Sequence, residues 1–233
     1  MNSGIEILYE DNHVIVAVKP PNMLSQGDIT GDRSILDELK EYVRVKYNKA
    51  GEAYLGLVHR LDRPVGGLMV FARTSKAAAR LSLELREHRL GREYLAVVEG
   101  ETPEKFLFED ELIKDEKTNI VRVAQGGKAA QLSGETIAVQ NGLSLVYIKL
   151  GTGRGHQIRV QLAHHGYPLV GDARYGLGGT GIALFGAVLR FTHPVKKEVL
   201  VFSASPKAPA FDGFGEAVQS FLKGVRDGKA VSL

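Results

Sequence analysis

Hydrophobic residues recur along the chain mostly in short runs with the period of two that is typical of β-strands. Two β-branched runs, 5–9 and 14–18, are separated by Asp11-Asn12, a dipeptide typical of a hairpin turn. Further runs that predict strands lie at 57–62, 68–71, 93–100, 119–125, 144–150 and 198–205.

Four other segments place hydrophobic residues three or four positions apart, which predicts amphipathic helices. Their expected extents are 35–50, with Ser34 as N-cap and Gly51 as the stop; 75–90, with Thr74 or Ser75 as N-cap and Gly91 as the stop; about 156–165; and 214–225. Strands outnumber helices and do not alternate with them regularly. The pattern therefore predicts an α+β fold with a mixed or antiparallel sheet rather than a doubly wound one.

Length and composition narrow the functional classes. The chain has 233 residues, 44% of them hydrophobic, and a net charge of +3, which permits a polyanionic partner without requiring one. The absence of cysteine excludes disulfides, thiolate catalysis and cysteine-bound metal. The histidines have no metal-binding spacing, so no metal site is predicted.

No segment suggests a membrane protein. The N-terminus lacks the basic lead of a signal peptide, and the longest apolar run, Ile182 to Leu189, is too short to span a bilayer. The expectation is a cytoplasmic protein whose residues from about 225 to 233 form a frayed tail.

The stretch "LGTGRGHQIRVQLAHHGYPLVGDARYG" (150–176) leads from a predicted strand through a glycine-rich loop into a predicted helix. This is the local setting of a nucleotide-binding loop and resembles that of S-adenosylmethionine-dependent methyltransferases. The alternative is that the glycines allow close backbone approach while Arg154, His156 and Arg159 face an anion. Phosphate suits such a place at the start of a helix.

The stretch "GLVHRLDRPVGGLMVFAR" (56–73) places charged residues between two apolar runs. Asp62 is predicted to end a strand, between Arg60 and Arg63. One interpretation is a salt-bridged turn residue. The other is a positioned, ionised carboxylate, which suits a nucleophile or a base rather than an acid.

Three blocks together carry a family resemblance: "HRLD" followed by "GL", then "REYLAVVEG", then "GRGHQIRVQLAHHGYPLVGDARYG". In this order and approximate spacing they resemble the RluA-type family of RNA pseudouridine synthases. The opening "ILYEDNHVIVAVKPPNMLSQ" and the late "LRFTHPVKKEVLVFSASPKAPAF" resemble that family's first and last strands, so the resemblance covers nearly the whole chain.

The resemblance implies one catalytic domain spanning 1–233, with a bent, mostly antiparallel mixed sheet, flanking helices and a central catalytic cleft. The family detaches uracil from the sugar of a uridine in RNA and rejoins it through carbon 5. Its catalytic aspartate falls on Asp62, its active-site tyrosine on Tyr94, and the arginine that partners the aspartate on Arg159. Arg60, Arg154 and His156 are expected to bind the RNA. The extruded base needs an aromatic face and charged anchors.

The resemblance also implies a tRNA or ribosomal RNA substrate, no cofactor, and a monomer. The small N-terminal RNA-binding module of many relatives is expected to be absent. Five positions depart from the family pattern and put substrate choice in doubt: Val65 and Gly66 replace Thr-Ser, Arg92 replaces lysine, Gly155 replaces threonine and Gln161 replaces histidine. Two rival functions remain at this stage, an RNA methyltransferase built on the Gly151 loop and a non-catalytic RNA-binding module.

Overall fold

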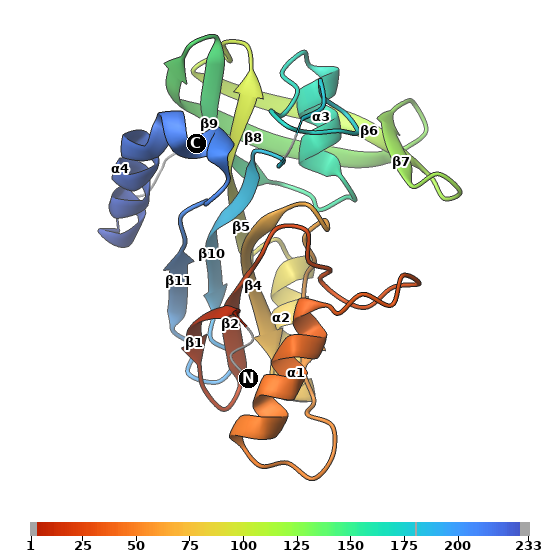
Figure 1. Ribbon diagram of the computed structural model, residues 1–233, viewed down its shortest axis with the longest axis vertical. Coiled ribbons are helices and arrows are strands. Elements are labelled where there is room, and N and C mark those ends of the chain that lie inside the picture. Colours follow the sequence, from red (N-terminus) through yellow and green to blue (C-terminus); the bar gives the residue numbers. More distant parts are fainter. Residues whose placement is uncertain (1–3, 180, 229–233) are drawn as a thin grey trace. The chain divides into compact units, whose positions relative to one another are not determined.

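The computed structural model describes residues 4–179 and 181–228, which form helices and a mostly antiparallel sheet (Figure 1). The strands are β1 (Glu6–Glu10), β2 (Val14–Lys19), β3 (Gly56–Leu57), β4 (Gly66–Ala72), β5 (Gly91–Glu99), β6 (Lys105–Asp115), β7 (Ile120–Val123), β8 (Lys128–Gln140), β9 (Leu143–Leu150), β10 (Leu184–Thr192) and β11 (Val199–Ser203). The helices are α1 (Ile35–Lys46), α2 (Ser75–Arg86), α3 (Gln157–His164), the 3-10 helix η1 (Pro209–Phe214) and α4 (Gly215–Arg226). The predicted α+β class is confirmed.

The chain forms two compact units. The first comprises Met1–Gly91 and Val188–Ala204. Its strand order is β1-β2-β4-β10, with β3 also paired to β4 and β11 to β10. Helix α2 packs Ala77 and Leu81 into a core that includes Val14, Val70 and Phe191.

Helix α1 begins where the sequence predicts. The Ser34 side chain accepts a hydrogen bond from the Asp37 backbone, and the Asp37 carboxylate accepts one from the Ser34 backbone, which completes a capping box. The helix buries Ile35, Leu39 and Val43, as their spacing requires. It ends at Lys46, before the predicted stop.

The second unit comprises Arg92–Ala187 and Ser205–Leu233, with the strand order β10-β5-β9-β8-β6-β7. Helix α3 packs Val160 against Leu112, Val121 and Ala130 of the β6, β7 and β8 strands. Helix α4 lies on β9, where the Phe221 and Tyr147 rings approach to 4.8 Å between centroids.

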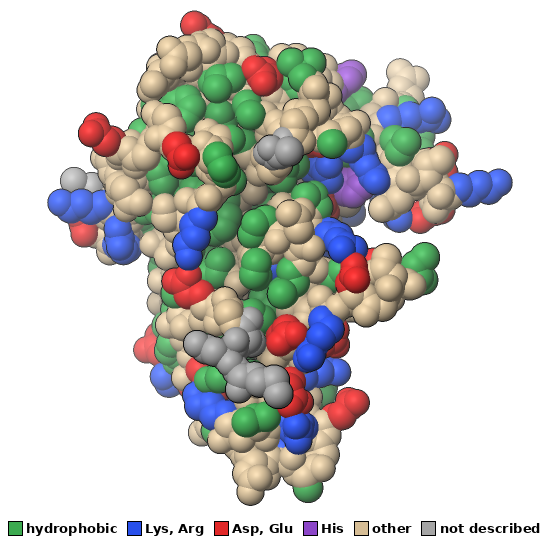
Figure 2. Space-filling view, in the orientation of Figure 1, with side chains coloured by type: hydrophobic (Ala, Val, Ile, Leu, Met, Phe, Trp, Pro, Cys, Tyr) green, Lys and Arg blue, Asp and Glu red, His purple; other side chains and the backbone are tan. Residues whose placement is uncertain are grey.

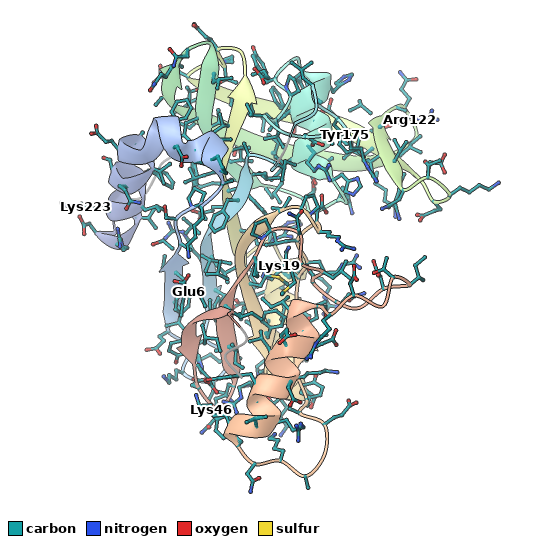
Figure 3. The ribbon with its side chains drawn as sticks, in the orientation of Figure 1. Glu6, Lys19, Lys46, Arg122, Tyr175 and Lys223 are labelled. Atoms are coloured by element: carbon teal, nitrogen blue, oxygen red, sulfur yellow. The ribbon has the colours of Figure 1, made fainter. Side chains whose placement is uncertain are left out.

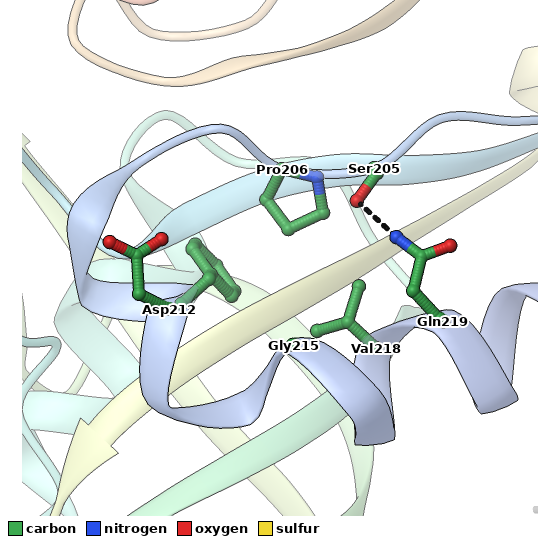
Figure 4. Close-up of a pocket in the computed structure, with 7 residues that line it drawn as sticks. Ser205, Pro206, Asp212, Gly215, Val218 and Gln219 are labelled. Carbon is green, nitrogen blue, oxygen red and sulfur yellow. Dashed lines mark hydrogen bonds between the residues drawn. The ribbon is translucent and has the colours of Figure 1, made fainter.

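A small pocket lies between α4 and the segment that leads to it (Figure 4). It is lined by Ser205, Pro206, Phe211, Asp212, Gly215, Val218 and Gln219, with Gln219 Nε2 donating to Ser205 Oγ over 3.2 Å. None of the predicted site residues lines it.

Several expectations are corrected. Strands β6, β8 and β10 were not predicted, and the predicted strand at 57–62 ends at Leu57. Helix α4 ends at Arg226 with Val225 buried, and residues 229–233 of the expected frayed tail lie outside the described residues. No helix within residues 4–179 and 181–228 is long and apolar enough to cross a membrane.

Candidate active site

The predicted site residues divide between the two units. Arg60 and Asp62 belong to the first unit, and Tyr94, Arg154, His156 and Arg159 belong to the second. The convergence of both sets on one catalytic centre remains a prediction.

Asp62 lies in a loop, not at the end of a strand, because its neighbours bond to side chains rather than to a partner strand. Ser25 Oγ accepts a hydrogen bond from Leu61 N over 3.0 Å and donates one to Leu61 O over 2.7 Å. Asp62 O accepts from Val65 N over 3.0 Å, which closes a turn at the arginine and proline between them. The carboxylate is partly buried, and the backbone on both sides of it is fixed.

Arg63, directly after Asp62, is held from two sides. Its Nη2 donates to Asp32 Oδ2 over 2.6 Å, and its carbonyl accepts a hydrogen bond from Lys19 Nζ over 3.1 Å. Arg60, two residues before Asp62, is exposed. The loop therefore offers a partly exposed carboxylate between two exposed arginines, of which Arg63 is held by Asp32.

Lys19, at the end of β2, has a fully buried side chain beneath this loop (labelled in Figure 3). Its Nζ donates to the carbonyls of Pro20, Met23 and Arg63 over 3.0, 2.7 and 3.1 Å. Burial lowers the pKa of Lys19 to about 7, against the opposing effect of the nearby Asp62 charge, which raises it. The buried Lys19 side chain thus holds the Asp62 loop through the Arg63 carbonyl.

Arg159 is held by a carboxylate that was not predicted as its partner. Its Nε and Nη2 donate to the two oxygens of Asp172 over 2.8 and 2.7 Å, a bidentate pair. The side chains of Arg159 and Asp172 are only 8% and 1% exposed. Burial alone would raise the pKa of Asp172, but the Arg159 guanidinium and backbone hydrogen bonds from Arg174 and Tyr175 hold it below its usual value.

The Arg159 guanidinium is therefore held in place by Asp172 within the protein. Its Nε and Nη2 both bond Asp172, which fixes the plane of the guanidinium. The predicted pairing of Arg159 with Asp62 remains a prediction.

Tyr175 connects Arg159 to His156 (labelled in Figure 3). The Arg159 guanidinium carbon lies 5.2 Å from the centre of the Tyr175 ring, within cation–π range. The Tyr175 hydroxyl lies 2.7 Å from His156 Nδ1 and accepts a hydrogen bond from Val121 N over 3.0 Å. Two of the predicted RNA-binding residues are thus brought together, through a tyrosine that was not predicted.

Two glycines of the glycine-rich loop lie close to side chains of neighbouring strands. A Cβ at Gly151 would lie 2.5 Å from Gln131 Oε1, and one at Gly153 would lie 2.8 Å from an Arg92 nitrogen. Close approach explains these two glycines, whereas a Cβ at Gly155 would meet nothing within 4 Å.

Arg154 is exposed within this loop, and its backbone is ordered by Gln157. Gln157 Oε1 accepts hydrogen bonds from Arg154 N over 2.9 Å and from the Thr152 hydroxyl over 2.7 Å. Arg154 Nε donates to Ala129 O over 3.0 Å, so the guanidinium is oriented by one bond.

Tyr94 occupies β5 opposite Ile148 of β9 and is 5% exposed. Its neighbour Glu93 is also buried and accepts a 2.7 Å hydrogen bond from the Tyr147 hydroxyl. The sheet, rather than a flexible loop, positions the Tyr94 ring.

Two of the residues that depart from the family pattern, Val65 and Gln161, are buried. Val65 is buried, at 2% exposure, so its methyl groups pack where a hydroxyl is commoner. Gln161 is fully buried and its Nε2 donates to Asp110 Oδ2 over 2.7 Å, while its Oε1 has no hydrogen-bond partner in the described part of the chain.

Sequence reasoning missed Lys19, Ser25, Asp172 and Tyr175. Asp172 and Tyr175 stand inside the "GDARYG" end of the third block, so the block marked them without giving a role. Lys19 is the last residue of an apolar strand. A buried lysine is rare, and its place at the end of that strand was the only sequence feature that singled it out. Ser25 gave none.

Known proteins are similar to this chain along most of its length. The family model described as RNA pseudouridylate synthase matches residues 13–164. Among similar proteins, the RNA pseudouridine synthase YhcT of Bacillus subtilis is 35% identical over 86% of this chain and 68% of its own length. The ribosomal large subunit pseudouridine synthase C of Escherichia coli K12 is 33% identical over 91% of this chain and 69% of its own length.

Solved structures support the fold. The human RNA pseudouridylate synthase domain containing 4 superposes with a TM-score of 0.73, covering 94% of this chain and 93% of its own, at 20% identity. A second human protein, RNA pseudouridylate synthase domain containing 1, gives a TM-score of 0.71 at 19% identity, covering 97% of this chain and 96% of its own. The methyltransferase alternative finds no support in these matches. The chain belongs to the RNA pseudouridylate synthase family, the isomerases that convert uridine to pseudouridine in RNA.

Proposed function

We propose that this enzyme modifies uridine in large-subunit ribosomal RNA and that Asp62 is its catalytic residue. The substrate proposal rests on the similarity to the ribosomal large subunit pseudouridine synthase C of several bacteria, at 30–34% identity. Because bacterial ribosomal RNA is cytoplasmic, the same proposal includes a cytoplasmic location.

The proposed role of Asp62 rests on the hydrogen bonds that hold its loop in place. Ser25 fixes the preceding residue through two hydrogen bonds, and Asp32 and Lys19 fix the following one. A carboxylate whose backbone is held on both sides is oriented before the substrate arrives, and such preorganisation is what catalysis requires.

The reaction moves the glycosidic bond within one nucleoside. The bond from N1 of uracil to C1′ of the ribose breaks, the base turns, and a bond from C5 to C1′ forms. C5 loses its hydrogen as a proton and N1 gains one, so the product is an isomer and no oxidant or reductant is consumed. In this scheme Asp62 acts on the nucleoside and Tyr94 stacks on the detached base.

The remaining predicted residues bind the RNA. Arg154 and Arg60 are exposed and reach phosphates, while Arg159, fixed by Asp172, presents a planar cation of defined orientation. His156 is oriented by the Tyr175 hydroxyl at 2.7 Å.

The test uses unmodified transcripts of bacterial large-subunit ribosomal RNA and of tRNA. After incubation with the enzyme, pseudouridine is labelled with a carbodiimide and its positions are read by primer extension. The expected result is modification at one or a few positions of the ribosomal transcript and none in tRNA. Modification of tRNA alone would overturn the proposed substrate while leaving the family intact.

A further inference from the structure

The loop from Gln26 to Arg33, between β2 and α1, projects from the first unit (Figure 1). All eight of its residues are exposed, whereas Ser25 before it and Ser34 after it are buried. Ile29 is the only hydrophobic residue of the loop, with a relative exposure of 104%. Figure 2 shows hydrophobic atoms at the tip of the loop.

The tip is built by specific hydrogen bonds. Asp28 Oδ1 accepts hydrogen bonds from Thr30 N over 2.9 Å and from the Thr30 hydroxyl over 2.5 Å, which forms a turn directly around Ile29. Gly31 has a φ of 75°, a conformation that glycine adopts without strain. Because Ile29 is β-branched, it also has few side-chain rotamers to lose on contact.

Both ends of the loop are tied to the neighbours of Asp62. At one end Ser25 bonds both backbone groups of Leu61. At the other end Asp32 binds Arg63 over 2.6 Å. A nucleotide placed at Asp62 therefore has this loop as its neighbour within the same unit.

The charges of the loop argue against a phosphate contact. It carries Asp28, Asp32 and Arg33, and these are engaged by Thr30, Arg63 and Glu38 respectively. Two carboxylates and one cation repel rather than attract an RNA backbone. What the loop offers to RNA is the apolar side chain at its tip, and apolar wedges against base steps are an established way in which proteins hold distorted nucleic acid.

We propose that Ile29 is a positioning residue that packs against a base of the RNA next to the uridine held at Asp62. This inference rests on the proposed function. It gives the loop a task in the reaction, which is to occupy stacking surface that becomes available when the uridine leaves its helix. Release of that base from the stack requires energy, and the Ile29 contact recovers part of it.

The test compares Ile29→Ala and Ile29→Leu with the wild type on the large-subunit ribosomal RNA transcript, with kcat and KM measured separately. Val45→Ala is the matched control, because Val45 is another exposed aliphatic residue of the same unit, 63% exposed on α1. Since Ile29 buries nothing, all variants should melt at the wild-type temperature.

Ile29→Ala should lower kcat/KM by about tenfold, equivalent to about 1.4 kcal/mol, Ile29→Leu should restore it to within about twofold, and Val45→Ala should have no effect. An Ile29→Ala enzyme within about twofold of wild type, an Ile29→Leu enzyme as slow as Ile29→Ala, or a lowered melting temperature in either would overturn the inference. Inactive wild-type enzyme would instead overturn the proposed substrate, and with it this inference. Active wild type beside an unaffected Ile29→Ala refutes the inference alone.

Discussion

Asp172→Asn tests how much the second unit depends on one buried ion pair. The substitution keeps the size of the side chain and an oxygen that can still accept from Arg174 N and Tyr175 N, which now bond Asp172 Oδ1 over 2.9 and 3.2 Å. It removes the negative charge, and the amide then presents N–H donors to a guanidinium that can only donate. Arg159 becomes a buried cation without its bidentate partner.

The expected loss is large because both side chains are almost completely buried, at 8% and 1% exposure. Breaking a buried pair by removing one charge costs about 3–5 kcal/mol of unfolding free energy, since the remaining charge stays desolvated. An exposed pair contributes about 0–1 kcal/mol. The matched control is therefore Glu116→Gln, which breaks the exposed pair between Lys114 and Glu116, whose side chains are 43% and 79% exposed.

Urea unfolding of the wild type and both variants measures the difference. The pKa of Asp172 is lowered in the folded state, so its stabilisation is present above the ordinary value of 3.8 and is lost as pH falls through the lower folded value. The Asp172→Asn deficit should therefore be constant from about pH 8 to about pH 5. A deficit below about 1 kcal/mol, or one equal to that of Glu116→Gln, would refute the assignment of a stabilising buried pair.

Three further outcomes are expected. Burial lowers the pKa of Lys19 from 10.5 to about 7, so between those values the unfolded chain binds more protons and stability rises with pH. Relative to Lys19→Met, the unfolding free energy of the wild type should increase by about 2 kcal/mol between about pH 7 and pH 9. Lys76→Met, at an exposed lysine, is the control. If the wild type and Lys19→Met showed parallel pH dependence, the lowered pKa of the buried lysine would be contradicted. Arg154→Ala should weaken RNA binding and reduce its salt slope by about one, and an unchanged slope would place Arg154 away from phosphate. Arg159→Lys should fold yet lose most turnover, because lysine lacks the planar two-point grip on Asp172, and wild-type single-turnover rates would end that role.

The periodicity of the sequence predicted elements that carry their own signal. Helix α1 has a capping box and a buried stripe, and β1 and β2 are β-branched runs joined by a turn, so local chemistry was enough. Strands β6 and β8 were missed because much of each is exposed and polar, which leaves no strong alternation to read. Strand β10 lies within an apolar run that shows no alternation, because it is buried on both faces.

The residues of the candidate site also fall into those that the sequence predicted and those that it did not. The three sequence blocks marked Asp62, Tyr94 and Arg159 as a set through a family resemblance. The residues that hold them are distant in sequence: Ser25 is 36 residues from Leu61, and Lys19 is 44 from Arg63. Such contacts follow from the fold and leave no pattern along the chain. The strand predicted up to Asp62 was wrong for the same reason, since Ser25 satisfies the backbone that a strand partner would otherwise bond.

The central claim is that the Asp62 carboxylate catalyses the isomerisation. Asp62→Asn removes the charge while keeping the size, and Glu52→Gln, which removes an exposed carboxylate of the same unit, is the matched control. With enzyme in excess over the large-subunit ribosomal RNA transcript, Asp62→Asn should form no pseudouridine while its RNA affinity falls by less than about tenfold. Substantial pseudouridine formation by a pure Asp62→Asn preparation would contradict the account.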